Sequence, residues 1–161
     1  MGIPGSIEFP IVDPRGLVTP HYDGWSIDVW IIPEEGEPLI PSRLLNVSQK
    51  LVMNDNLCVI TDSCLGPLKI QSKAQVIGST QLPVCQIKIK GFALTKARLV
   101  ISIRPYNPEG ISFINSIASI ALLKDAFGWK VNQENFVYFD KPADRYVVFR
   151  STRLPRILRC E

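Results

Sequence analysis

The feature of this sequence that most constrains its fold is an alternation of apolar and polar side chains with a period of two residues. It runs through GWSIDVWII (24–32), LKIQSKAQV (68–76) and CQIKIKG (85–91). Successive side chains of a β-strand point to opposite faces, so the alternation predicts antiparallel strands with one buried and one solvated face.

Further segments of the chain share strand-like composition and are separated by turn residues. We expect strands near 24–32, 49–54, 57–62, 67–77, 83–92, 97–104, 111–122, 128–132, 135–139 and 145–150. The segment 112–128 also fits a helical spacing of apolar residues, but its alternating serines and isoleucines favour a strand. Thirteen prolines and ten glycines favour a sandwich over a helical bundle.

The predicted architecture is all-β, a mainly antiparallel β-sandwich with little helix, and we expect a single domain over 1–150. Residues 151–161 form a basic tail in which Arg153, Arg156 and Arg159 recur at every third position. This spacing is typical of a solvated linker, and an acidic partner is the alternative interpretation.

Composition excludes several classes of protein and partner. A chain of 161 residues that is 46% hydrophobic and 20% charged has enough apolar residues for a folded core. The net charge of +3 is scattered, with no basic stripe interleaved with aromatics, so we expect no nucleic-acid partner. No apolar run approaches the roughly 20 residues of a membrane span, so we expect no membrane partner.

The cysteines and the single histidine give little indication of a metal or cofactor. The four cysteines contain no C-x-x-C pair and are Cys58, Cys64, Cys85 and Cys160. We therefore expect no metal, no cofactor and free thiols in a reducing, cytoplasmic setting, with a Cys58–Cys64 disulfide as the alternative. The amino end also lacks the pattern of a secretory signal.

Catalytic motifs are not evident, and we expect no enzymatic activity from this chain alone. His21 lies near Asp23, but no G-x-S-x-G elbow supplies a nucleophile, so a small hydrolase is the least favoured hypothesis. Glu34, Glu35 and Glu37 fall in a proline-bounded turn, where carboxylates are hydrated. Neither of the glycine-rich phosphate-binding motifs, G-x-x-x-x-G-K and G-x-G-x-x-G, occurs in the sequence.

Aromatic side chains are the remaining candidates for a binding surface. Trp30 points opposite to the apolar stripe of its strand, and Tyr106 and Trp129 lie near turns. Rings in such places serve either to stack against a sugar or to face a neighbouring domain.

The stretch ARLVISIRPYNPEGISFI (97–114) resembles part of the amino-terminal β-sandwich domain of glucoamylase- and glycogen-debranching-type glycoside hydrolases. In that family a strand ends in an Arg-Pro-x-Asn-Pro-x-Gly turn, which here consists of Arg104, Pro105, Asn107, Pro108 and Gly110. The segment 128–149 is similar to the hairpins that follow, and DGWSIDVWIIP (23–33) is similar to the first edge strand.

The resemblance implies a supersandwich-like fold and an accessory role. The family carries its catalytic carboxylates on an α/α toroid, which this sequence lacks. We therefore expect a non-catalytic domain that packs on such a toroid domain, in the same or another chain, or shapes its oligosaccharide cleft. The alternative is a freestanding carbohydrate-binding module. The candidate carbohydrate or interdomain surface comprises Trp30, Arg104, Tyr106, Asn107, Glu109 and Trp129. The turn itself is expected to be structural, since Pro105 and Pro108 withhold ladder donors.

Overall fold

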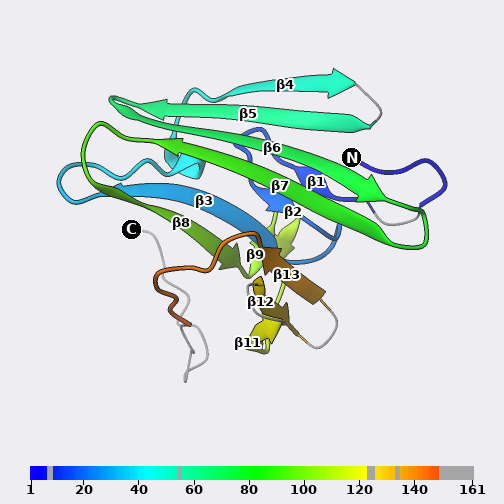
Figure 1. The fold of residues 1–161 in the computed structure, drawn as a ribbon. Coiled ribbons are helices and arrows are strands. Elements are labelled where there is room, and N and C mark those ends of the chain that lie inside the picture. The colour runs from blue at the N-terminus through cyan, green and yellow to red at the C-terminus, as the bar shows by residue number, and fades with distance from the viewer. Residues whose placement is uncertain (7–8, 54–55, 123–125, 133–134, 149–161) are drawn as a thin grey trace. The chain divides into compact units, whose positions relative to one another are not determined.

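The computed structural model describes residues 1–6, 9–53, 56–122, 126–132 and 135–148 of the chain. Within these residues every strand pairing is antiparallel, and the one helical segment is a 3-10 turn, η1, at Pro41–Arg43. The strands are β1 (Ile11–Val12), β2 (Val18–Thr19), β3 (Ser26–Pro33), β4 (Ser48–Met53), β5 (Leu57–Leu65), β6 (Leu68–Gly78), β7 (Pro83–Phe92), β8 (Ala97–Arg104), β9 (Tyr106–Asn107), β10 (Gly110–Ile111), β11 (Ile117–Leu122), β12 (Ala126–Val131) and β13 (Asn135–Phe139). The all-β prediction is confirmed (Figure 1).

The chain divides into two compact units, Met1–Phe113 and Ile114–Glu161. The sequence predicts a single domain over 1–150, because no low-complexity linker divides the chain. Each unit has its own sheets, and we describe each by itself.

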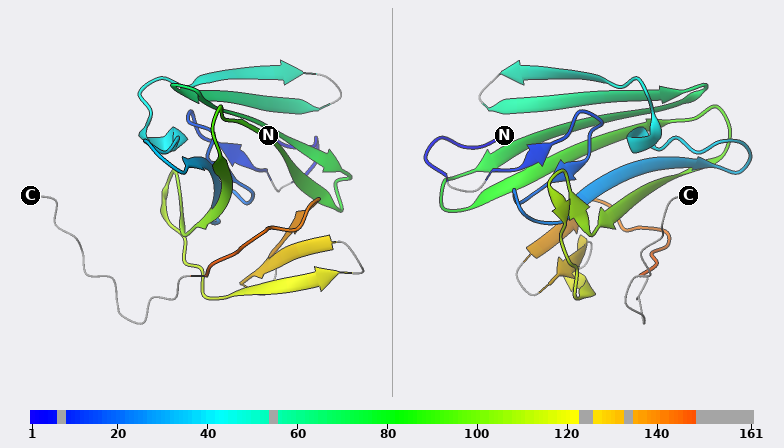
Figure 2. Two further views of the ribbon diagram at one scale, coloured as in Figure 1. Left: turned by 60° about the vertical axis from the view of Figure 1, so that its left-hand side comes forward. Right: turned by 180° about the vertical axis from the view of Figure 1, so that it is seen from behind.

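The first unit is a β-sandwich of two four-stranded sheets. One sheet has the order β1-β2-β3-β8, and the other has the order β4-β5-β6-β7 (Figures 1 and 2). In the first sheet, β3 pairs with β8 along its whole length, from Ser26 opposite Arg104 to Pro33 opposite Ala97. In the second, β6 pairs with β7 from Lys69 opposite Phe92 to Gly78 opposite Pro83.

The core of the sandwich lies between these sheets. Val29 and Ile31 of β3 pack with Leu68 and Ile70 of β6, and all four are buried. Leu39 completes this cluster with no exposed surface, because the loop after β3 folds back and Leu39 exchanges two backbone hydrogen bonds with Ile31.

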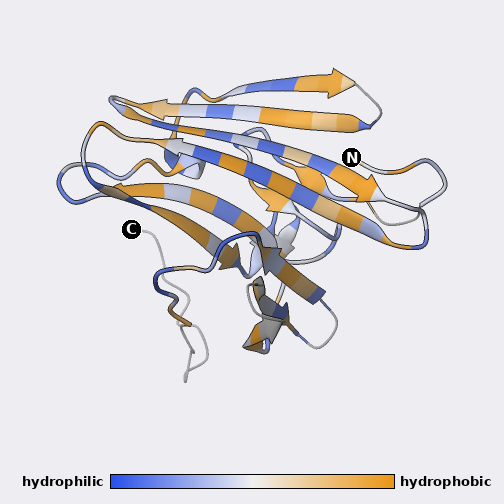
Figure 3. Cartoon of the chain, viewed as in Figure 1, coloured by the Kyte–Doolittle hydropathy of each residue, from blue (hydrophilic) through white to orange (hydrophobic). Residues whose placement is uncertain are grey.

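The alternation read from the sequence is present in the strands. Along β6, Leu68, Ile70, Ala74 and Val76 are buried, whereas the intervening lysines and glutamines are exposed or half-buried. Figure 3 shows the same pattern as bands of opposite hydropathy along β6 and β7. Burial of one face of each sheet is therefore the source of the fold's stability.

The second unit contains one three-stranded antiparallel sheet of order β11-β12-β13. Strand β11 pairs with β12 from Ile117 opposite Val131 to Leu122 opposite Ala126. The other edge of β12 pairs with β13. The segment that fitted both a helix and a strand therefore contains a strand, as its serine–isoleucine alternation favoured.

One expectation from the sequence needs correction, and one alternative that it left open is not met. Residues 145–148 of the expected strand at 145–150 have no regular structure, and the rest of that segment, like the basic tail at 151–161, lies outside the described residues. The alternative to free thiols, a Cys58–Cys64 disulfide, is not formed. Both cysteines lie in β5, six residues apart, and an extended chain of that length separates them by about 20 Å.

Candidate functional site: the turn after β8 and the Arg104 stack

The turn RPYNPEG follows β8 and forms a small hairpin of β9 and β10. Gly110 pairs with Asn107, and Ile111 pairs with Tyr106. The side-chain oxygen Oδ1 of Asn107 accepts hydrogen bonds from the backbone N–H groups of Glu109, at 2.8 Å, and Gly110, at 3.1 Å. Asn107 therefore holds the turn closed with its own side chain, as asparagine commonly does in turns.

The other end of the Asn107 amide reaches a distant part of the chain. Its Nδ2 donates a hydrogen bond of 2.8 Å to the carbonyl oxygen of Gly24, 83 residues earlier. Gly24 closes a tight turn of its own by donating its N–H to the carbonyl of His21 at 2.8 Å. The segments DGW (23–25) and RPYNPEG (104–110), far apart in the sequence, thus meet at one side chain.

Arg104 connects this turn to the outward face of β3. The centre of its guanidinium lies 5.1 Å from the ring centroid of Trp30 and 5.0 Å from that of Tyr106. All three side chains are half-buried. A guanidinium at this distance from two rings makes a cation–π contact with each, so the Arg104 stack (Trp30, Arg104 and Tyr106) is an ordered cluster.

Asp28 is buried on the same outward side of β3, with 4% of its surface exposed. Its Oδ1 accepts a hydrogen bond of 2.9 Å from the N–H of Val29. Burial raises the pKa of Asp28 above its ordinary value, and the nearby N–H groups of Trp30 and Val29 and the charge of Arg104 oppose that rise without cancelling it. Trp30 Nε1 and Asp28 Oδ2 are both buried, and neither has a hydrogen-bond partner of good geometry in the described structure.

Asp28 is not placed to act as a general acid or base. The Asp28 oxygen without a partner is buried beyond the reach of a substrate, and general acid–base catalysis requires the catalytic group to lie within hydrogen-bond reach of the substrate. Among the described residues, no group of three or more histidine, cysteine or acidic side chains is placed to hold a metal ion. The turn carboxylates Glu34, Glu35 and Glu37 are exposed, and Glu34 forms an ion pair of 2.6 Å with Lys96.

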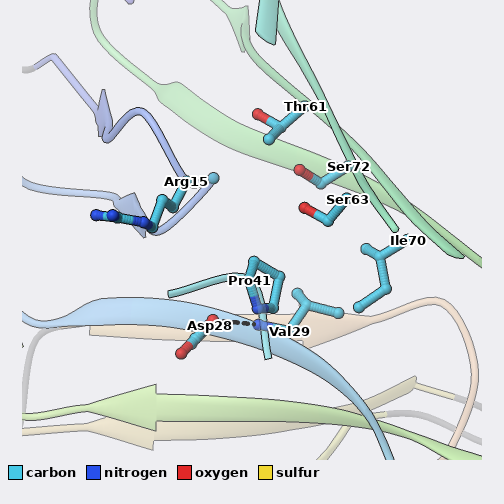
Figure 4. A pocket seen from close by; sticks show the side chains of 9 residues that line it. Arg15, Asp28, Val29, Pro41, Thr61, Ser63, Ile70 and Ser72 are labelled. Atoms are coloured by element: carbon cyan, nitrogen blue, oxygen red, sulfur yellow. Dashed lines mark hydrogen bonds between the residues drawn. The ribbon is translucent and has the colours of Figure 1, made fainter. Parts of the chain in front are cut away.

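A small cavity lies between the sheets of the first unit (Figure 4). The hydroxyls of Thr61, Ser63 and Ser72 point into it from β5 and β6, whereas the carboxylate of Asp28 points away from them. Its free volume of about 10 Å³ is close to the minimum for one water molecule. The cavity therefore has no room for a substrate.

The other two residues of the predicted surface, Glu109 and Trp129, do not belong to the Arg104 stack. Glu109 is exposed at the tip of the turn. Trp129 belongs to the second unit, where its ring packs edge-on against Phe139 at 4.9 Å and Phe127 at 6.3 Å. The structure therefore gathers Trp30, Arg104, Tyr106 and Asn107 within one unit and places Trp129 inside an aromatic cluster of another.

Comparison with known proteins adds no assignment to this geometry. Neither the family models, nor the curated proteins, nor the solved structures contain a match to the chain. In the described residues no helix has the length and apolar character of a membrane span.

Proposed function

We propose that this chain is a non-catalytic β-sandwich domain that packs against the catalytic helical-toroid domain of a carbohydrate-active protein of the glucoamylase or glycogen-debranching type. The proposal rests on the Arg104 stack. Tryptophan, tyrosine and arginine are the residues that most often dominate binding energy at protein interfaces, and here one of each lies in a single cluster.

The shape of the cluster favours a protein partner over a small ligand. Small-molecule sites are concave and hold a few convergent polar groups. In the part of the chain that the structure describes, the cavity found lies between the sheets and not at the Arg104 stack. The guanidinium lies over both rings, at 5.1 Å and 5.0 Å from their centroids, so the stack offers an aromatic surface with a positive charge.

The carbohydrate context comes from the resemblance of residues 97–114. These residues form β8, the turn and β10, and the asparagine of the motif makes the bonds that hold the turn and the loop at Gly24 together. The asparagine of the motif therefore holds the turn in place in this chain, and the turn carries part of the surface that we assign to the partner.

The test is isothermal titration calorimetry of the purified chain against toroid-type catalytic domains encoded in the same genome. We expect saturable binding to one of them, weakened about 30-fold by Trp30→Ala and by Arg104→Ala, which corresponds to roughly 2 kcal/mol. Arg98→Ala, an exposed arginine of β8 on the same face, is the matched control and should leave affinity unchanged.

The alternative is a freestanding carbohydrate-binding module that uses the same rings. It predicts that malto-oligosaccharides change the tryptophan fluorescence of the wild-type chain and not that of Trp30→Ala. That result, together with no binding to any toroid domain, would replace the proposed function.

A further inference from the structure

Among the described residues, β13 is an outer strand of the three-stranded sheet and pairs with β12 alone, and it lacks the usual protection against further pairing. Strands at sheet edges expose unpaired backbone groups, and proteins usually guard them with charges, prolines or bulges. Three edge strands of the first unit follow this rule: β4 carries Lys50, β7 carries Lys88 and Lys90 after an initial proline, and β8 carries Arg98 and Arg104. The fourth, β1, is uncharged but only two residues long, and a short edge strand is itself a form of protection.

β13 has the sequence NFVYF, with no charge, proline or glycine. Phe136 and Tyr138 lie on one face of this strand with 50% and 58% of their surfaces exposed. The opposite edge strand, β11, is also uncharged, but its exposed residues include the small side chains Ala118 and Ser119. The exposed aromatic surface of the sheet is therefore concentrated on β13.

The two rings of β13 are held in a fixed arrangement. Their planes are parallel to within 3°, with centroids 6.1 Å apart. Tyr138 lies opposite Gly128, where a Cβ atom would come within 3.2 Å of its ring, and the ammonium of Lys130 lies 5.8 Å from the ring centroid of Phe136. Glycine on β12 leaves room for the tyrosine ring, as in known glycine–aromatic pairs across strands.

We propose that β13 pairs edge to edge with β13 of a second copy of this chain, as an antiparallel two-fold interface centred on Val137. The strand is self-complementary about this residue, as an interface between identical surfaces requires. A two-fold axis at Val137 sets Phe136 of one copy opposite Tyr138 of the other, twice. The two sheets then form one six-stranded sheet with a row of four aromatic rings on one face, and paired aromatic rings across strands are stabilising.

The contact between the two copies is small. Five residues from each copy bury less surface than a stable interface of standard size, so the dimer forms at high protein concentration and dissociates on dilution. By sedimentation equilibrium we expect a mass near twice the 18.0 kDa of the chain at roughly 0.5 mM protein, and the monomer mass at roughly 1 μM.

Two double variants test the register. Phe136→Glu/Tyr138→Glu places like charges opposite each other across the interface and should abolish the dimer. Phe136→Glu/Tyr138→Lys removes the same two rings but sets a glutamate opposite a lysine in both places, and should retain dimerisation. Both variants keep a glutamate beside Lys130, and Leu45→Lys, at a 94% exposed site of the first unit, controls for loss of an exposed apolar side chain.

A wild-type chain that is monomeric at roughly 0.5 mM would overturn the proposal, as would equal behaviour of the two double variants. If either variant loses its β-sheet circular dichroism, hydrogen exchange of the wild-type chain decides instead. Amides of β13 should exchange more slowly at the high concentration than at the low one, and unchanged exchange there would also overturn the proposal. Neither measurement involves carbohydrate or a toroid domain, so its outcome is independent of the proposed function.

Discussion

Asn107 donates a hydrogen bond from Nδ2 to the carbonyl oxygen of Gly24, and its Oδ1 closes the turn that follows β8. One side chain thus connects two loops that lie 83 residues apart. This connection fixes the hairpin that carries Tyr106 beside the end of β8, where Arg104 begins the stack with Trp30. A surface built in this way is ordered before any partner arrives, which reduces the entropic cost of binding.

Replacement of Asn107 should reveal both of its roles. Asn107→Ala removes the hydrogen bond to Gly24 and the two that close the turn, and should lower the free energy of unfolding by about 3 kcal/mol, since each hydrogen bond contributes roughly 1 kcal/mol. Asn107→Asp keeps the acceptor but sets a carboxylate oxygen against the Gly24 carbonyl. It should therefore be destabilised as well, and it should retain the turn. Urea unfolding measures both losses, and an Asn107→Ala chain as stable as wild type would contradict this account.

The contact between Arg104 and Trp30 should appear as a coupling energy. A double-mutant cycle of Arg104→Ala and Trp30→Ala should give a coupling of about 1 kcal/mol, the range for a half-buried cation–π contact. The same cycle with Arg98→Ala in place of Arg104→Ala should give a coupling near zero, because Arg98 is exposed and, unlike Arg104, is not among the cations that lie over a ring in the described residues. Equal couplings in the two cycles would show that the stack contributes nothing specific.

Stability should fall with rising pH because of Asp28. The folded state raises the pKa of this carboxyl above its ordinary 3.8 through burial, so between the unfolded and folded pKa values the folded chain holds more protons than the unfolded chain. Stability in this window therefore decreases as pH rises, and the full penalty is present above the folded pKa. Asp28→Asn removes the titration, so its stability relative to wild type should increase from acid to neutral pH. Urea unfolding at several pH values tests this, and a difference independent of pH would contradict it.

The cysteines should differ in reactivity because of their burial. Cys64 is exposed on β5, whereas burial raises the pKa of the Cys85 thiol to about 11. In a Cys160→Ser chain at mildly alkaline pH, we expect a disulfide reagent to modify Cys64 first and Cys85 far more slowly, since the thiolate is the reacting species. Mass spectrometry of peptides after short exposure identifies the modified site. Faster modification of Cys85 than of Cys64 would contradict the burial seen here.

The β12–β13 pair should tolerate no side chain at Gly128. A Cβ atom there would lie 2.5 Å from the carbonyl oxygen of Val137, so Gly128→Ala forces the backbone apart and should cost about 1–3 kcal/mol in the second unit. Gly2→Ala, whose Cβ would make an ordinary contact of 3.5 Å, is the control. Loss of hydrogen-exchange protection in β11–β13 for the first variant alone is the expected result, and wild-type protection in Gly128→Ala would be inconsistent with the register.

Sequence periodicity predicted the strands that have one clearly buried face, and missed features that depend on distant contacts. The alternation in residues 68–76 was sufficient to place β6, because burial itself selects alternate side chains. The fold-back of Leu39 onto Ile31 carries no such local signal, since it is made by backbone groups. The division of the chain after Phe113 is likewise marked by no low-complexity linker in the sequence.

The candidate site was predicted in part for the same reason. Trp30 was identified because it interrupts the apolar stripe of its strand, and the turn after β8 because of its prolines. Nothing local shows that Arg104 lies between Trp30 and Tyr106, as its partner across the ladder is Ser26 and not Trp30. In the sequence, Phe136 and Tyr138 show only as alternate aromatic residues of a strand. The position of that strand, β13, at the outside of its sheet follows from the order of the strands, which the sequence does not show.

The measurement that tests the central claim most directly is the indole signal of Trp30 in a two-dimensional NMR spectrum of the chain labelled at tryptophan nitrogen. Trp30→Phe assigns that signal among the three indoles. We predict that it shifts or broadens on addition of a toroid-type catalytic domain from the same genome and stays in place on addition of malto-oligosaccharides. A saturable shift with the sugar and none with the protein would contradict the assignment of this surface to a protein partner.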